Sequence, residues 1–294
     1  MKRVIDALAG RLAVLMLRSL KRTDPERLAA FAAAVMRRVG AWLPEQRVGG
    51  ANLAAAFPEK TEAARAAILR EVWANMGRLG AEYVHLDTLW DAEAALRGEG
   101  RFEIDAATRE ILAEVRDDGL PALFFTAHTG SWEFLGPMMA TFGLRTIVLY
   151  RPPNNAEVDA SIRALRASKS SEVLATTRDA VPKILRALAA GRHVGMVVDQ
   201  HFGNGADITF FGRPCKANAT LARLARRIDC PIYGSRVIRL PGYRFRIEAV
   251  RFDAARDADG RIDVAATTQK INDVVESWVR EFPDQWLWLH RRWR

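Results

Sequence analysis

Three short apolar runs, separated by segments with helical periodicity, constrain the fold of this 294-residue chain more than any other feature. The runs are Ala122–Ala127, Thr146–Tyr150 and His193–Val198. Each has the length of a strand buried on both faces, and such strands occur in parallel sheets that helices cover. The sequence therefore predicts an α/β protein with a mostly parallel central sheet flanked by helices.

Helical periodicity and two later strand patterns complete the predicted layout. The helical patterns lie near residues 131–142, 156–168, 178–190 and 264–281. Ile232–Leu240 and Tyr243–Phe252 have the composition of strands, and the Pro-Gly pair between them is typical of a turn. We find no pattern for Asn204–Ala206 or Cys215–Asn218 and expect loops there.

The first 100 residues read as a helical region. Asp24 followed by Pro25 is typical of a helix start, with Asp24 as the N-cap. A second start at Thr61 precedes a long helical pattern over residues 62–85. An N-terminal helical region therefore precedes the predicted sheet.

The N-terminal end of this region is basic and amphipathic. Apolar residues from Val4 to Met16 fall on one helical face, and residues 1–50 contain ten Lys or Arg against four Asp or Glu. Such a helix can lie in a membrane interface with its cations near acidic lipids, or it can pack on the protein's own core. We expect residues 1–45 to form membrane-associating helices and residues 46–294 to form the domain that holds the site.

The uncharged stretches are too short for an ordinary transmembrane helix. The longest, Gly119–Trp132, has 14 residues, whereas a spanning helix needs about 20 apolar residues. Asp6, Arg11 and Arg18 interrupt any apolar core of a cleavable signal peptide. The two cysteines cannot build a disulfide framework, which favours a reducing compartment.

Polar residues follow each of the three apolar runs directly. The runs end at His128, at Arg151, and at Asp199 with Gln200. In open α/β sheets, ligands bind beyond the carboxyl ends of the strands. If the three strands are parallel, these side chains share one edge of the sheet, and the sequence predicts a site there.

His128 and Glu133 are the candidate acid–base pair of this site. Five residues of a continuous helix turn through about 500°, so the two side chains would diverge by about 140°. They can meet only if His128 ends the strand and Glu133 lies in the first helical turn, with Gly130 allowing a tight turn. A carboxylate beside an imidazole fixes its tautomer and makes a general base that can take a proton from a hydroxyl.

Other readings of the same residues stay open at this point. Ser131 lies near His128 and could belong to a serine hydrolase, although the Gly-x-Ser-x-Gly pattern is absent. Cys215 could be a nucleophile, but no base is placed near it. His193 begins a strand and Asp199 ends it, so we do not expect these two residues to converge with His201 in a metal site. The net charge of +9 also allows a non-catalytic protein that binds anionic lipid or nucleic acid.

The His-x4-Glu spacing resembles the motif of the lysophospholipid acyltransferase group, which is His-x4-Asp/Glu. A wider set of segments, in family order over residues 45–294, resembles the late acyltransferases of lipid A biosynthesis, the lauroyl and myristoyl transferases. These segments are Asn52–Glu59, Trp73–Arg78 with Glu82, Thr126–Glu133, Tyr150–Asn155, Val198–Gln200, Phe210–Pro214 and Trp286–Trp293.

The resemblance implies a glycerolipid-acyltransferase-like fold and a specific reaction. A fatty acyl chain would move from an acyl-carrier-protein thioester to a hydroxyl of a membrane glycolipid, most simply a lipid A precursor, without a cofactor or metal. Another lysolipid or an aminolipid is the alternative acceptor. By this analogy His128 is the base, Glu133 orients it, and no covalent acyl-enzyme forms.

The resemblance also assigns the surrounding residues and the partners. Arg151 would stabilise the oxyanion or bind a substrate phosphate, and Asp199 with Gln200 would shape the site. Trp132, Phe134 and Met138 are the candidates for an acyl groove. The implied enzyme is peripheral or monotopic on the cytoplasmic face of the inner membrane, with acyl carrier protein as donor and no nucleic acid as partner.

Overall fold

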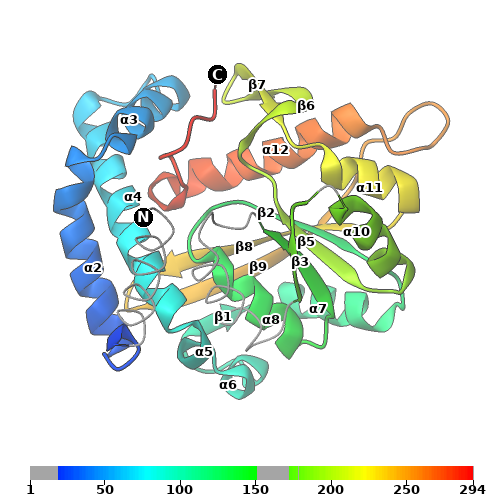
Figure 1. Ribbon diagram of the computed structural model, residues 1–294, viewed down its shortest axis with the longest axis horizontal. Helices are drawn as coiled ribbons and strands as arrows, with labels where there is room; N and C mark the ends of the chain where they lie inside the picture. The colour runs from blue at the N-terminus through cyan, green and yellow to red at the C-terminus, as the bar shows by residue number, and fades with distance from the viewer. Residues whose placement is uncertain (1–18, 151–171, 178, 294) are drawn as a thin grey trace, which may run out of the picture.

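The computed structural model describes residues 19–150, 172–177 and 179–293 (Figure 1). A central sheet of seven strands has helices on both faces, with the order β1-β9-β8-β2-β5-β3-β4. Its strands are β1 (Phe102–Ile104), β2 (Leu123–Thr126), β3 (Thr146–Tyr150), β4 (Glu172–Ala175), β5 (His193–Val197), β8 (Ile232–Leu240) and β9 (Arg244–Phe252). Neighbouring strands are parallel except for β8 and β9, which pair antiparallel. The predicted fold class is therefore confirmed.

Alternate residues of the buried strands face two different hydrophobic cores. In β2, Leu123 and Phe125 belong to one cluster, and Phe124 between them belongs to the other. The first cluster contains the apolar faces of α10 (Ala180–Ala189), α11 (Thr220–Ile228) and α12 (Val264–Glu281), and the second contains those of α7 (Ala106–Asp117) and α8 (Leu135–Thr141). The apolar residues of such a strand are thus buried on both faces of the sheet. Burial of each large apolar side chain stabilises the fold by about 1.5–3 kcal/mol.

Three helices between residues 25 and 84 form a separate layer at one end of the sheet (Figure 1). They are α2 (Pro25–Val39), α3 (Glu45–Ala56) and α4 (Glu62–Val84), with the single 3-10 turn η1 (Gly40–Trp42) after α2. Asp24 and Thr61 cap α2 and α4, because their side chains accept hydrogen bonds from the backbone N–H of Arg27 and Ala64 at 2.8 and 3.2 Å. Both predicted helix starts are confirmed, and α2 packs along α4.

Several elements were not predicted, and two predicted loops are strands. Strands β6 (His201–Phe210) and β7 (Arg213–Ala217) form an antiparallel hairpin that packs on α12, and they include the segments expected to be loops. Their composition hides the strand pattern, since glycine and asparagine in β6 replace the usual β-branched residues. Strands β1 and β4 and helices α7 and α11 were not predicted either, whereas the short helices α5 (Leu86–Leu89) and α6 (Ala92–Arg97) lie within the first 100 residues, which were expected to be helical.

The remaining expectations fall partly outside the described residues. The helix predicted near 156–168, Arg151, and the amphipathic segment from Val4 to Met16 lie there, and the domain boundary at residue 45 stays a prediction. Within the residues that the structure describes, no helix is both long and apolar enough to cross a membrane.

Gly130 supports the first testable prediction, because its backbone has φ +55° and an added Cβ would lie 1.9 Å from the carbonyl oxygen of Val237. A Gly130→Ala variant combines this overlap with a left-handed backbone that alone costs about 1–3 kcal/mol. Gly191 has φ +69° with open space around it, so Gly191→Ala is the matched control. We expect a much lower thermal unfolding midpoint for Gly130→Ala than for Gly191→Ala, and equal midpoints would contradict this packing.

Candidate active site

His128 and Asp199 meet at the carboxyl edge of the sheet. Strands β2 and β5 are parallel, with Thr126 opposite Val197, and each of the two residues lies two positions beyond its strand. Asp199 Oδ1 lies 2.7 Å from His128 Nδ1, and Asp199 Oδ2 accepts the backbone N–H of His128 at 2.8 Å. The topology of the sheet therefore builds this pair from residues 71 positions apart in sequence.

The Asp199 carboxylate is fully buried and stays ionised. Burial alone would raise its pKa, but the neighbouring His128 charge and the hydrogen bonds from His128 hold this pKa well below its ordinary value. Trp286 Nε1 donates a further hydrogen bond to Oδ2 at 2.7 Å. Because an ionised carboxylate only accepts hydrogen bonds, Nδ1 of His128 carries the proton, and Nε2 is the nitrogen left for proton transfer.

The pKa of His128 is raised above its ordinary value. Burial opposes the charged imidazole, but the Asp199 charge and hydrogen bond outweigh it, and the negative charge of Glu133 adds to the same effect. His128 is therefore a stronger base than a free histidine.

The loop that carries His128 is fixed by the C-terminal segment, residues 283–293. Gly130 N–H donates to the Gln285 carbonyl at 2.9 Å, and Leu287 N–H donates to the His128 carbonyl at 3.0 Å. Thr129 and Trp286 form an isolated β-bridge between these two bonds.

The helical layer in turn holds the C-terminal segment in place. Asn52 of α3 donates its side-chain N–H to the carbonyls of Trp288 and His290 at 2.8 and 2.7 Å. Asn75 of α4 donates to the Asp284 carbonyl at 2.9 Å. Both asparagines are buried, so their side-chain N–H groups take the place of water as hydrogen-bond donors to these backbone carbonyls.

A buried ion pair lies beneath the same loop. Arg239 of β8 binds the Glu82 carboxylate of α4, with Nη2 to Oε2 at 3.0 Å, and both residues are almost fully shielded from solvent. Ser131 Oγ donates to Glu82 Oε2 at 2.5 Å and accepts from Arg239 Nη2 at 2.7 Å. Ser131 is fully buried in this network, which argues against its use as a nucleophile.

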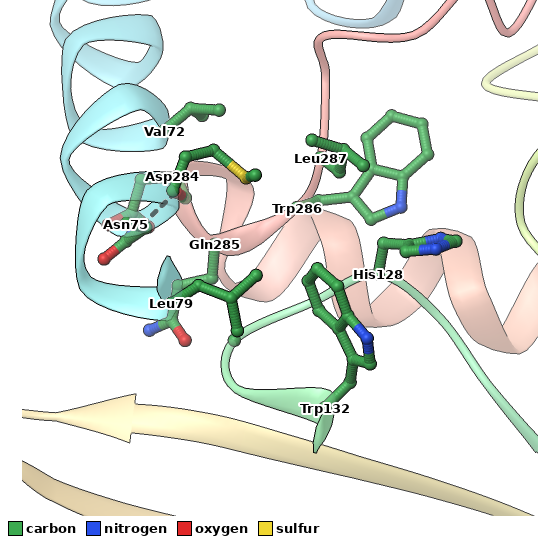
Figure 2. A pocket seen from close by; sticks show the side chains of 11 residues that line it. Val72, Asn75, Leu79, His128, Trp132, Asp284, Gln285, Trp286 and Leu287 are labelled. Carbon is green, nitrogen blue, oxygen red and sulfur yellow. Dashed lines mark hydrogen bonds between the residues drawn. The ribbon is translucent and has the colours of Figure 1, made fainter. Parts of the chain in front are cut away.

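A pocket opens beside His128 (Figure 2). Its walls are formed by α4, by the C-terminal segment and by the His128 loop, and Figure 2 shows the His128 ring between the indoles of Trp286 and Trp132. The lining residues are Val72, Asn75, Met76, Leu79, His128, Gly130, Trp132, Asp284, Gln285, Trp286 and Leu287. The pocket thus combines apolar side chains of α4 with one basic imidazole.

Comparison with known proteins identifies the family. The chain matches the family described as bacterial lipid A biosynthesis acyltransferase over residues 8–294, which is nearly its whole length. The chain belongs to this family. It is therefore an acyltransferase, as the sequence motifs predicted.

Two curated relatives are similar over most of the chain. The lipid A biosynthesis myristoyltransferase of Escherichia coli (strain K12) is 24% identical over 245 residues, which cover 81% of this chain and 72% of the relative. The lipid A biosynthesis acyltransferase 1 of Shigella flexneri has the same identity and the same coverage.

The candidate site differs from the predicted pair in the carboxylate that contacts His128 Nδ1. A ring nitrogen of histidine forms one hydrogen bond in the plane of the ring. Asp199 Oδ1 makes that bond with Nδ1, so Glu133 cannot bind Nδ1. Glu133 lies in the 3-10 turn η2 (Trp132–Phe134) and acts on the imidazole through its charge. Sequence spacing favoured Glu133 because it is near in the chain, whereas Asp199 comes from the neighbouring parallel strand.

The other predicted site residues are separated by the structure. Trp132 lines the pocket, and its ring lies 4.9 Å from the His128 ring, edge to face. Phe134 and Met138 are fully buried in the second core cluster and do not line the pocket. Gln200 follows Asp199 and is exposed to solvent, and Arg151 lies outside the described residues.

Four residues around His128 were given no place in the predicted site: Glu82, Arg239, Gln285 and Trp286. Two of them, Glu82 and Trp286, stand in segments that carry the family resemblance, and this was the only signal in the sequence. For the described residues, no group of three or more His, Cys, Asp or Glu side chains is arranged to hold a metal ion. Cys215 is buried, and burial raises the pKa of its thiol, which disfavours a thiolate nucleophile.

The histidine pKa values provide the second prediction, measurable by NMR titration of the five imidazoles. We expect His128 to titrate above about 6.5, the ordinary value, and His193 and His290, whose pKa values burial lowers, to titrate below it. Asp199→Asn removes the charge that favours imidazolium, so the pKa of His128 should fall. His128→Gln assigns the resonance, and an unchanged pKa in Asp199→Asn would refute the pairing.

Proposed function

We propose that this acyltransferase moves a fatty acyl chain from an acyl-carrier-protein thioester to a hydroxyl of a lipid A precursor, with His128 as the general base. The observation that carries the proposal is the His128–Asp199 contact at the edge of a pocket that Val72, Met76 and Leu79 line on one side. The names of the family and of the two relatives support lipid A biosynthesis as the process.

In the proposed reaction, His128 Nε2 takes the proton from the acceptor hydroxyl while that oxygen attacks the thioester carbonyl. A carbon–oxygen bond forms, the tetrahedral intermediate collapses, and the carbon–sulfur bond breaks. The proton on Nε2 then passes to the departing thiolate, so the imidazole returns to its starting state. The Asp199 carboxylate stabilises the imidazolium that exists between the two transfers.

Direct transfer, without an acyl-enzyme, is part of the proposal. Ser131 is buried and bound by Glu82 and Arg239, and Cys215 is buried with a raised thiol pKa. Glu133 contributes negative charge that favours imidazolium, and Arg151 is retained as the proposed group for the oxyanion or a substrate phosphate.

The pocket beside His128 is the proposed start of the acyl groove. Val72, Met76 and Leu79 of α4 line it together with Trp132, the one predicted groove residue that the pocket retains. Apolar side chains on this wall would bury the methylenes of the acyl chain, at about 0.8 kcal/mol for each. Phe134 and Met138 belong to the second core cluster and are no longer part of the proposed groove.

We also propose peripheral attachment to the cytoplasmic face of the inner membrane. Phe31, Val35 and Trp42 expose 68%, 37% and 82% of their surface, although they are large apolar residues on α2 and η1. The exposed Arg27 and Arg38 lie on the same helix. Exposed aromatic residues beside arginine suit the interface of a membrane with acidic headgroups.

Acyl transfer by the purified protein is the third prediction and tests the proposed function. Acyl-carrier-protein thioesters of several chain lengths are offered with lipid A precursors, lysolipids and aminolipids, and products are detected by mass spectrometry. Because general-base catalysis contributes about 10²–10⁴ in rate, His128→Ala should be slower by at least about 10²-fold. Glu133→Ala should be slower by a smaller factor, because its charge supports the imidazolium without holding Nδ1.

If the His128→Ala variant transfers the acyl chain at the normal rate, the mechanism is rejected. Product with a lysolipid or an aminolipid alone would keep the mechanism and replace the acceptor.

Vesicle binding is the fourth prediction. The double variant Phe31→Ser with Trp42→Ser should bind phosphatidylglycerol vesicles at least about tenfold more weakly than the wild type, because two apolar side chains no longer enter the interface. Leu120→Ser is the matched control, since Leu120 exposes 52% of its surface outside this helix. Equal losses for both variants in a sedimentation assay would exclude the exposed surface of α2 and η1 as the membrane-binding surface.

A further inference from the structure

We propose that Trp286 is a positioning residue of this acyltransferase, whose indole N–H holds the Asp199 carboxylate in the orientation that His128 Nδ1 requires. The inference rests on the proposed role of His128 as general base. It assigns to the C-terminal segment a part in the chemistry that the family assignment does not specify.

The hydrogen bonds of Asp199 show why a positioning group is needed. Oδ1 binds His128 Nδ1, and Oδ2 binds the His128 backbone N–H and Trp286 Nε1, at 2.7, 2.8 and 2.7 Å. Asp199 has no exposed surface, so solvent cannot correct its orientation. Within the residues that the structure describes, His128 donates two of the three hydrogen bonds to this carboxylate, and the Trp286 indole donates the third.

The indole itself is held firmly. Trp286 exposes 1% of its surface and packs edge-on against Trp288, with ring centroids 4.6 Å apart. Its ring also lies 5.7 Å from that of Phe210. The backbone of Trp286 forms the β-bridge to Thr129, next to His128. One residue therefore fixes the carboxylate through its side chain and the His128 loop through its backbone.

Loss of the indole N–H has a predictable electrostatic sign. A donor on Oδ2 draws negative charge away from the carboxylate, so its removal makes Asp199 a stronger partner for imidazolium. The other charged groups near the pair are Glu133 from η2, and His290 and Arg292 from the C-terminal segment. A Trp286→Phe substitution does not alter Glu133 or Arg292. The Trp286 ring also packs edge-on against the His290 ring at 5.3 Å, so the pKa of His290 is followed in the same titration to separate its effect from that of the indole N–H.

The test compares Trp286→Phe with Trp288→Phe. Trp288 is the matched control, because it is also fully buried and donates its Nε1–H at 2.6 Å, but to the Pro283 carbonyl. For Trp286→Phe we expect the acid limb of the kcat/KM profile, and the NMR pKa of His128, to move up by about 0.5 pH unit or more. We also expect kcat to fall about tenfold with little change in KM, because the base is less well oriented.

A structural role alone predicts a different result. Trp288→Phe should lower the unfolding midpoint without moving the His128 pKa, and an equal shift in both variants, or none in Trp286→Phe, would overturn the proposal. The NMR readout does not depend on activity, so failure of the general-base mechanism, seen as normal transfer by His128→Ala, is distinguished from failure of this inference.

A wild-type measurement covers the case in which Trp286→Phe does not fold. The indole N–H resonance of Trp286 should shift with pH at the midpoint of the His128 titration, since both groups bind Asp199. An indole resonance that is independent of pH over this range would equally overturn the proposal.

Discussion

The contact between His128 Nδ1 and the buried Asp199 carboxylate is the interaction on which the site depends. It exists because β2 and β5 are parallel neighbours, so that the residues two positions beyond each strand reach the same point. A buried, ionised carboxylate is costly unless it is paired with a positive charge and fully hydrogen-bonded. Three donors satisfy Asp199, and two of them belong to His128 itself.

The elements around the pair serve to keep it in place. The C-terminal segment pairs with the His128 loop, and asparagines of α3 and α4 bind that segment in turn. Beneath the loop, the Glu82–Arg239 ion pair binds Ser131. Removal of one member of a buried pair costs about 3–5 kcal/mol, because the other charge remains without a partner. The N-terminal helices are therefore linked energetically to the position of the imidazole.

The sequence predicted the parts that depend on local pattern. Apolar runs located β2, β3 and β5, capping residues located the starts of α2 and α4, and strand ends located the edge at which His128 and Asp199 meet. Parallel pairing decides which carboxylate reaches Nδ1, and spacing along the chain favoured Glu133 instead. Trp286 is 87 residues from Asp199, and no local pattern carries a contact of that kind. Phe134 and Met138 are apolar residues that follow His128 closely in the sequence, which suited an acyl groove, but tertiary packing places them in the core.

The most direct test of this account is a double-mutant cycle on acyl transfer with His128→Ala, Asp199→Ala and the variant that carries both. If Asp199 acts only through His128, its loss has no further effect once the imidazole is gone. The account predicts that the double variant transfers as slowly as His128→Ala alone. Rate losses that multiply would contradict it, because they would show that Asp199 and His128 contribute independently.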